Sequence, residues 1–184
     1  MNNNIRKFGT LMLHGAPMPV PQKPFYRGDV IGFNGTDFEI GDTVEDKELT
    51  WLKLGNIWVC DRNILAGVSW DTLNAKGYVF GKEVTIDGHQ YKLRCLTGSD
   101  GSKESYGEGC DNEWDKLMDE YNEDNSLLHY DKMYTICQET DRDYSGYRSI
   151  RGYNSARYSS GDFATHTGAI VAFRPALEEL TPAD

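Results

Sequence analysis

Short apolar runs separated by turn-forming residues are the main pattern along the first half of the chain. A tight Asn-Gly or Asp-Gly type of turn between two such runs predicts a β-hairpin, because its central positions favour residues that tolerate positive φ. The expected strands are 30–33 with 36–40, 51–54 with 57–60, and 82–86 with 89–96. The turns between them are Asn34-Gly35, Gly55-Asn56 and Asp87-Gly88.

Two helices are expected where the apolar spacing changes to that of a helix. The first covers 70–76, because Ser69 can cap its start and Gly77 can end it. The second begins at Glu113 and carries one apolar stripe at three- and four-residue intervals. That stripe consists of Trp114, Leu117, Met118 and Tyr121. Short hairpins, two helices and long loops together predict an α+β chain with mainly antiparallel pairing.

The N-terminal residues have a different composition. Residues 1–26 hold four of the six prolines, which disfavour helix and cannot complete an interior sheet ladder. We therefore expect an extended proline-rich arm over 1–26, a β-hairpin or connector over 27–50, and one globular domain over 51–184. The apolar run 8–13 within the arm requires a partner, in the same domain or in a neighbouring subunit.

The segment 143–162 is the strongest candidate for a binding surface. It holds four tyrosines, five serines, three glycines and three arginines, and it precedes the apolar run 169–173, which predicts a buried strand. Tyrosine, serine and glycine are favoured in protein-binding loops, and arginine adds planar donors. The alternative is an ordinary surface loop whose tyrosines lie flat on the domain. The candidate ligand-binding residues are Tyr144, Tyr147, Arg148, Arg151, Tyr153, Asn154, Arg157 and Tyr158.

The charge distribution restricts the partners. The formal net charge is −10, and residues 100–131 carry 11 acidic and 2 basic groups. Nucleic-acid binding requires the opposite balance, so no nucleic-acid partner is expected. No apolar run approaches the roughly 20 residues of a membrane span, and the first residues lack the apolar core of a signal peptide. The protein is therefore expected to be made in a cytoplasm and to have no membrane partner.

Motifs for catalysis are not found in the sequence. The four histidines are far apart and match no metal-ligand spacing, and no nucleophile motif is present, so no enzymatic activity is expected. The four cysteines form no Cys-x-x-Cys pair and are expected to be free thiols. We expect no cofactor. A calcium ion in the acidic loop stays open as an alternative, with Asp100, Glu108, Asp111 and Glu113 as oxygen donors.

A series of short motifs resembles a group of bacteriophage virion proteins, often described as structural or tail-fibre proteins. Their C-terminal end is in turn similar to C-type-lectin-like domains of the formylglycine-generating type. The resemblance covers about residues 51–180. The motifs occur in the same order: Trp51–Lys53, Val68–Asp71, Tyr78–Gly81, Tyr91–Arg94, Leu96–Gly98, Asn112–Met118, Ile136–Glu139, Arg151–Tyr153 and Phe173–Glu178. Ala172-Phe173 and Ile136 depart from the pattern of these families.

The resemblance implies a C-type-lectin-like domain with a small twisted antiparallel sheet, two helices and long loops. It also implies a virion protein that displays residues 144–167 to a glycan or protein on the host surface and docks on other virion proteins through the N-terminal arm. The alternative is a head or tail decoration protein whose loops contact only neighbouring subunits. A homo-oligomer is expected in both cases. The catalytic branch of the lectin-like superfamily needs paired C-terminal cysteines, and here only Cys137 lies in the last 70 residues.

Overall fold

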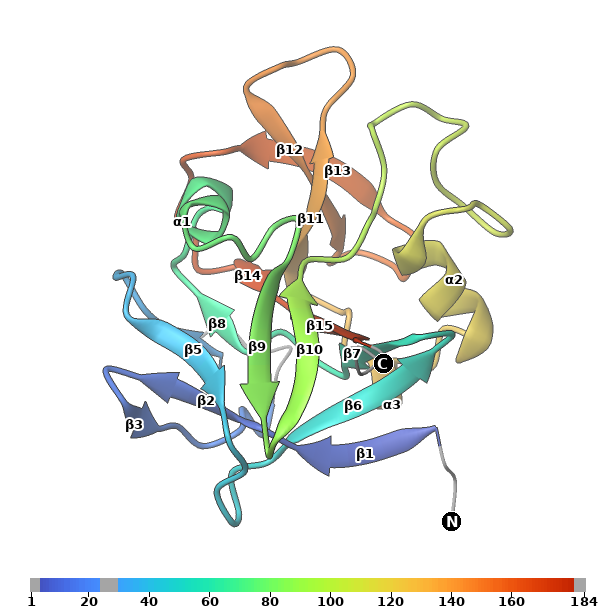
Figure 1. The fold of residues 1–184 in the computed structure, drawn as a ribbon. Coiled ribbons are helices and arrows are strands. Elements are labelled where there is room, and N and C mark those ends of the chain that lie inside the picture. Colours follow the sequence, from blue (N-terminus) through green and yellow to red (C-terminus); the bar gives the residue numbers. More distant parts are fainter. Residues whose placement is uncertain (1–3, 24–29, 181–184) are drawn as a thin grey trace.

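The fold is built mostly from short β-strands. The computed structural model describes residues 4–23 and 30–180, and 39% of these residues lie in strands and 11% in helices (Figure 1). The strands form three sheets, and the first of them curls into a half-barrel. The α+β prediction is therefore wrong, because strands of two to seven residues make up most of the regular structure.

The first sheet has six antiparallel strands in the order β1-β6-β7-β15-β10-β9. Hairpins predicted from the turn residues supply four of these strands and are confirmed. Both residues of the β9–β10 turn, Asp87 and Gly88, have positive φ, as a tight hairpin turn requires. The strands are β1 (Ile5–Phe8), β6 (Leu49–Leu54), β7 (Ile57–Cys60), β9 (Lys82–Ile86), β10 (His89–Arg94) and β15 (Ala176–Glu179).

The second sheet carries the candidate binding segment. Its order is β13-β12-β11-β14-β8-β4, and it mixes antiparallel with parallel neighbours. The apolar run 169–173 contains its central strand β14, as expected from the sequence. The strands are β4 (Ile31–Gly32), β8 (Leu65–Ala66), β11 (Tyr134–Thr140), β12 (Tyr147–Gly152), β13 (Ser159–Phe163) and β14 (Val171–Phe173).

The third sheet corrects the prediction for the N-terminal residues. Its order is β3-β2-β5, with β2 (Thr10–Leu13), β3 (Ala16–Pro17) and β5 (Phe38–Gly41). Leu11 and Leu13 are buried, and β1 pairs with β6 of the first sheet. Residues 5–17 of the expected arm therefore lie mostly in sheets, whereas residues 18–23 belong to no strand. The division of the chain at residues 26 and 50 stays a prediction.

The hairpin predicted around Asn34-Gly35 is also wrong. β4 pairs with β8, whereas β5 pairs with β2, so residues 33–37 carry the chain from one sheet to another. The remaining residues of the expected connector, 27–29, lie outside the described residues.

Three short helices accompany the sheets: α1 (Trp70–Ala75), α2 (Glu113–Glu120) and α3 (Asn125–Leu128). The first two are predicted from the sequence, and the third is missed because it has only one turn. Ser69 and Asn112 cap α1 and α2 by accepting hydrogen bonds from Thr72 N and Asp115 N. In the described part of the chain, no helix has the length and apolar character needed to cross a membrane.

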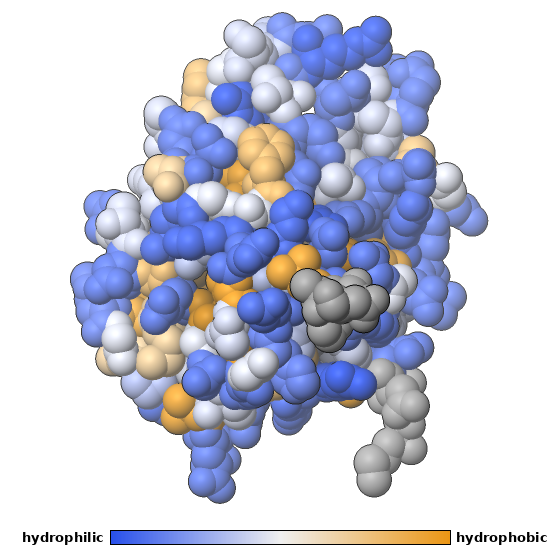
Figure 2. Space-filling model, viewed as in Figure 1, coloured by the Kyte–Doolittle hydropathy of each residue, from blue (hydrophilic) through white to orange (hydrophobic). Residues whose placement is uncertain are grey.

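Alternate residues of β6 and β7 face two separate cores. Trp51 and Trp58 belong to the main core, which the three sheets share. Leu52 and Val59 point to the opposite face, where they join a second core that contains Trp114, Leu117 and Met118 of α2. The face of the molecule in Figure 2 is largely hydrophilic, and its hydrophobic side chains form small separate patches. Burial on both faces of β6 and β7 fixes α2 against the first sheet.

Candidate functional site

The β12–β13 hairpin and the turn that leads into β12 present the most exposed aromatic side chains of the candidate segment. Tyr147 lies opposite Phe163 in the register, and their ring centroids are 4.6 Å apart in an edge-to-face contact. The ring of Tyr144 lies 5.6 Å from that of Tyr147. Tyr144 is 65% and Phe163 58% exposed, whereas Tyr147 is half-buried. We call these three residues the aromatic platform.

The backbone of β13 and of the loop before β12 determines how the rings of the platform lie. A Cβ atom at Gly161 would lie 3.0 Å from the Tyr147 ring, so glycine lets this ring lie across β13. The Asp141 carboxylate accepts hydrogen bonds from the backbone N–H groups of Asp143 and Tyr144 and thereby holds the loop before β12. The platform therefore stands on a defined turn and a paired hairpin.

A narrow crevice borders the platform. Its volume is about 10 Å³, the space of about one water molecule, and Trp70, Arg148, Phe163 and His166 are among the residues that line it. The guanidinium of Arg148 lies 4.4 Å from the centre of the Trp70 ring. His166 Nδ1 lies 2.5 Å from Asp162 Oδ2 at the rim. The site is thus a nearly flat aromatic surface with polar groups along one side.

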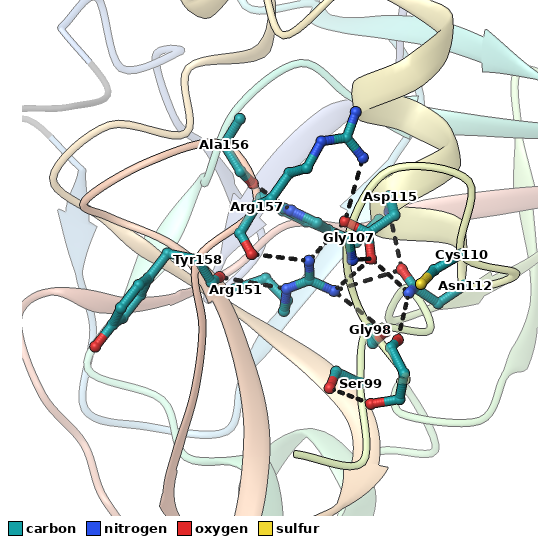
Figure 3. Close-up of polar contacts among 12 residues, drawn as sticks. Gly98, Ser99, Gly107, Cys110, Asn112, Asp115, Arg151, Ala156, Arg157 and Tyr158 are labelled. Carbon is teal, nitrogen blue, oxygen red and sulfur yellow. Dashed lines mark hydrogen bonds and ion pairs between the residues drawn. The ribbon is translucent and has the colours of Figure 1, made fainter. Parts of the chain in front are cut away.

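Arg151 does not belong to this exposed surface. Its side chain is completely buried, and its Nη2 atom donates to Asp115 Oδ1 of α2 at 2.7 Å (Figure 3). The same guanidinium donates to the backbone carbonyl oxygens of Gly98, Arg157 and Tyr158. This network joins the β12–β13 hairpin to α2 and holds the connection between β12 and β13.

Asp115 completes the network from the helix side. Its Oδ2 atom accepts hydrogen bonds from Gly107 N at 3.0 Å and from Asn112 Nδ2 at 2.6 Å. These donors, together with Arg151, compensate a carboxylate that is 0% exposed. Asp115, a member of the acidic segment 100–131, is therefore used inside the protein.

Arg157 reinforces the same connection nearer the surface. Its Nη2 atom donates to Asp119 Oδ1 at 2.6 Å, and its Nε atom donates to Glu123 Oε1 at 2.5 Å. Burial tends to lower the pKa of Arg157, and the hydrogen bonds and charges of Asp119 and Glu123 raise it. The arginine therefore stays charged and binds the loop to α2 rather than reaching outward.

The other candidates lie at the opposite end of the hairpin from Tyr144. Tyr153 stacks on Tyr134 with centroids 4.6 Å apart and has a φ of +80°. Tyr158 packs 6.2 Å from the same Tyr134 ring and is 38% exposed, and Asn154 is exposed. The eight sequence candidates therefore do not form one surface.

Four contributors to the site are missing from the sequence prediction: Trp70, Phe163, Asp162 and His166. Only the strand register brings Phe163 opposite Tyr147, and only the tertiary fold brings Trp70 next to Arg148. A sequence signal exists for Phe163, because it is a single large apolar residue in an otherwise polar strand, Ser159–Phe163.

The acidic loop is the place where the sequence leaves a calcium ion open as an alternative. Within the described residues, no group of three or more His, Cys, Asp or Glu side chains is arranged to hold a metal ion. Hydrogen bonds from Ser102 and Ser105 lower the pKa of Asp100 to about 2, and Asp111 pairs with Lys116. The two carboxylates are thus engaged with different partners.

All four cysteines are free thiols, as predicted, and three of them are buried. Burial raises the pKa of Cys60 to about 12 and raises the pKa of Cys95 and Cys137 as well. These three groups are therefore poor thiolate nucleophiles at neutral pH.

Comparison of the chain with protein-family models, curated proteins and solved structures gives no match in any of the three.

Proposed function

We propose that the protein is a ligand-binding module of a bacteriophage particle and that it presents the aromatic platform to the host surface. The observation that carries the binding role is the distribution of exposed aromatic rings. Among the described residues, the exposed large hydrophobic side chains are Phe80, Tyr144, Tyr158 and Phe163. Three of these come from the 144–167 segment, and the fourth, Phe80, contacts Trp70 beside the platform crevice.

The geometry of the platform suits recognition of an extended partner. Exposed tyrosine and phenylalanine rings on a rigid hairpin lose little conformational entropy on binding, and they offer apolar faces to a sugar ring or a protein side chain. Asp162 and His166 add polar groups at the rim. The crevice is too small for a drug-sized ligand, so contact across the platform surface is favoured over insertion.

We assign the protein to a phage particle because its ordered series of short motifs resembles that of virion proteins. Attachment to neighbouring virion proteins through the N-terminal residues and assembly into a homo-oligomer belong to the same proposal. Arg151 and Arg157 pair with acidic residues of α2 and are therefore not available to a ligand. The platform residues are the ones that we expect to contact the host.

The test of this function is adsorption of phage particles that carry the double substitution Tyr144→Ser and Phe163→Ser. Each exposed ring contributes about 0.5–1.5 kcal/mol of stacking, so adsorption should fall by roughly tenfold or more. Both side chains are largely exposed, so the melting temperature of the purified protein should change little.

Tyr158→Ser is the matched control, because it removes an exposed ring at the other end of the same hairpin. Its particles should adsorb normally. If the platform variant also adsorbs normally while its particles lose the protein, the decoration role replaces host recognition. Normal adsorption with normal incorporation would exclude the platform as a functional surface.

A further inference from the structure

A second and larger concavity lies on the first sheet. The groove has a volume of about 1030 Å³, and β1, the β9–β10 turn and the end of β15 border it. In Figure 1 this turn lies beside the end of β1, and a Cβ atom at Gly9 would lie 3.3 Å from Ile86. The two edges of the curled sheet therefore meet at one point, and the groove opens where they diverge. It shares no residue with the aromatic platform.

The strand register defines the wall of the groove. Arg6 lies opposite Trp51, Tyr91 opposite Glu179, and His89 opposite Ile86, so these side chains share the inner face of the half-barrel. The ring of Phe8, two residues from Arg6, stacks on Tyr91 with centroids 5.7 Å apart. Phe8 is half-buried and Tyr91 is 8% exposed, which makes them an aromatic floor beneath a polar mouth.

The two carboxylates at the mouth already have partners. Asp87 accepts hydrogen bonds from the backbone N–H and the hydroxyl of Thr43. Glu179 accepts from Lys53 Nζ at 2.8 Å and from Trp58 Nε1 at 2.6 Å. The hydrogen bond from Lys53 lowers the pKa of Glu179, so this carboxylate stays ionised and engaged.

The hydrogen-bond donors at the mouth of the groove differ from the two carboxylates. In residues 4–23 and 30–180, the side chains of Arg6, Lys7, His89 and Gln90 make no hydrogen bond or ion pair with another side chain or with the backbone. The guanidinium carbon of Arg6 lies 4.8 Å from the centre of the Trp58 ring, which holds the group at the wall of the groove. With both carboxylates engaged and the Arg6 guanidinium making no hydrogen bond to the described residues, the groove favours a negative group at Arg6.

We propose that this groove binds an acidic saccharide residue, with its carboxylate on Arg6 and its ring against the aromatic floor. A carboxylate matches the fork of the guanidinium. The apolar C–H face of a pyranose ring matches an aromatic floor next to polar side chains. Ligand binding in the groove does not require the aromatic platform. Either of the two proposals can therefore be wrong while the other holds.

Titration of the purified chain with glucuronate, followed by calorimetry and tryptophan fluorescence, tests this site. Glucose retains the ring and lacks the charge, and acetate retains the charge and lacks the ring. We expect saturable glucuronate binding that is at least about tenfold tighter than binding of either control, because a hydrogen bond to a charged group adds roughly 1.5–3 kcal/mol. The indole rings of Trp51 and Trp58 are buried behind the groove, in contact with Phe8 and Arg6, and should report the binding.

Arg6→Gln should weaken glucuronate binding by about tenfold or more. Lys103→Gln removes the same charge at an exposed position outside the groove and should leave affinity unchanged. Arg6→Lys, which keeps the charge and removes the fork, should give an intermediate affinity. The melting temperature of each variant shows whether the fold is retained.

Three results would each overturn the proposal. The first is the absence of saturable glucuronate binding by the folded protein. The second is equal affinity for glucuronate and acetate, which would leave a simple anion site with no role for the aromatic floor. The third is an equal effect of Arg6→Gln and Lys103→Gln on glucuronate binding.

Discussion

Trp114→Ala is expected to lower the free energy of unfolding by about 3–5 kcal/mol, the usual cost of removing a large aromatic side chain from a core. Trp114 is 0% exposed and packs in the core between α2 and the first sheet. Its Nε1 atom donates to the Ala156 carbonyl oxygen at 2.7 Å, and the guanidinium of Arg174 lies 5.3 Å from its ring. The substitution therefore leaves a cavity, an unpaired carbonyl and a buried arginine without its aromatic contact.

Denaturant unfolding of the purified protein measures this change, with Tyr144→Ala as the control. Tyr144 is also a large aromatic residue, but it is 65% exposed, so its removal should change the free energy of unfolding by less than about 0.5 kcal/mol. A Trp114→Ala protein as stable as the control would mean that α2 does not pack on the first sheet as described.

Features that depend on local chemistry are predicted well from this sequence. The hairpins at 51–60 and 82–94 follow from their turn residues, and α2 follows from its apolar stripe. These signals lie within about ten residues of each other, so no distant contact is needed to form the element.

Features that depend on distant pairing are not predicted. The prolines of residues 1–26 indicate an extended arm, yet Pro17 lies in β3, an edge strand where a missing N–H is tolerated. β1 belongs to the first sheet only because it pairs with β6, more than 40 residues later. The two central strands β14 and β15 follow one another directly in the chain but join different sheets. The wrong fold class results from such non-local pairings.

The candidate site also combines features that local composition predicts with features that depend on distant residues. Composition identifies the 144–167 segment as a source of exposed tyrosines, and Tyr144 is indeed exposed. Composition cannot separate the arginines that reach solvent from those that pair with α2, because their partners lie in a different segment. Arg151 and Asp115 are 36 residues apart in the sequence and form a completely buried pair.

Arg151→Ala is expected to lower the free energy of unfolding by about 3–5 kcal/mol, because it leaves the buried Asp115 carboxylate without its nearest cation and with only Arg157 Nη1, 3.6 Å away. It also removes the donors to the carbonyl oxygens of Gly98 and Tyr158, so the β12–β13 connection should lose protection from hydrogen exchange.

The double substitution Arg151→Met and Asp115→Asn tests whether the uncompensated charge is the cause. Met occupies much of the arginine volume, and Asn retains an acceptor for Gly107 N without a charge. The double variant should therefore be more stable than Arg151→Ala, and the two single substitutions at 151 and 115 should couple by about 0.5–3 kcal/mol in a double-mutant cycle. Additive effects, or a loss below about 1 kcal/mol for Arg151→Ala, would place Arg151 at the surface and return it to the set of candidate ligand contacts.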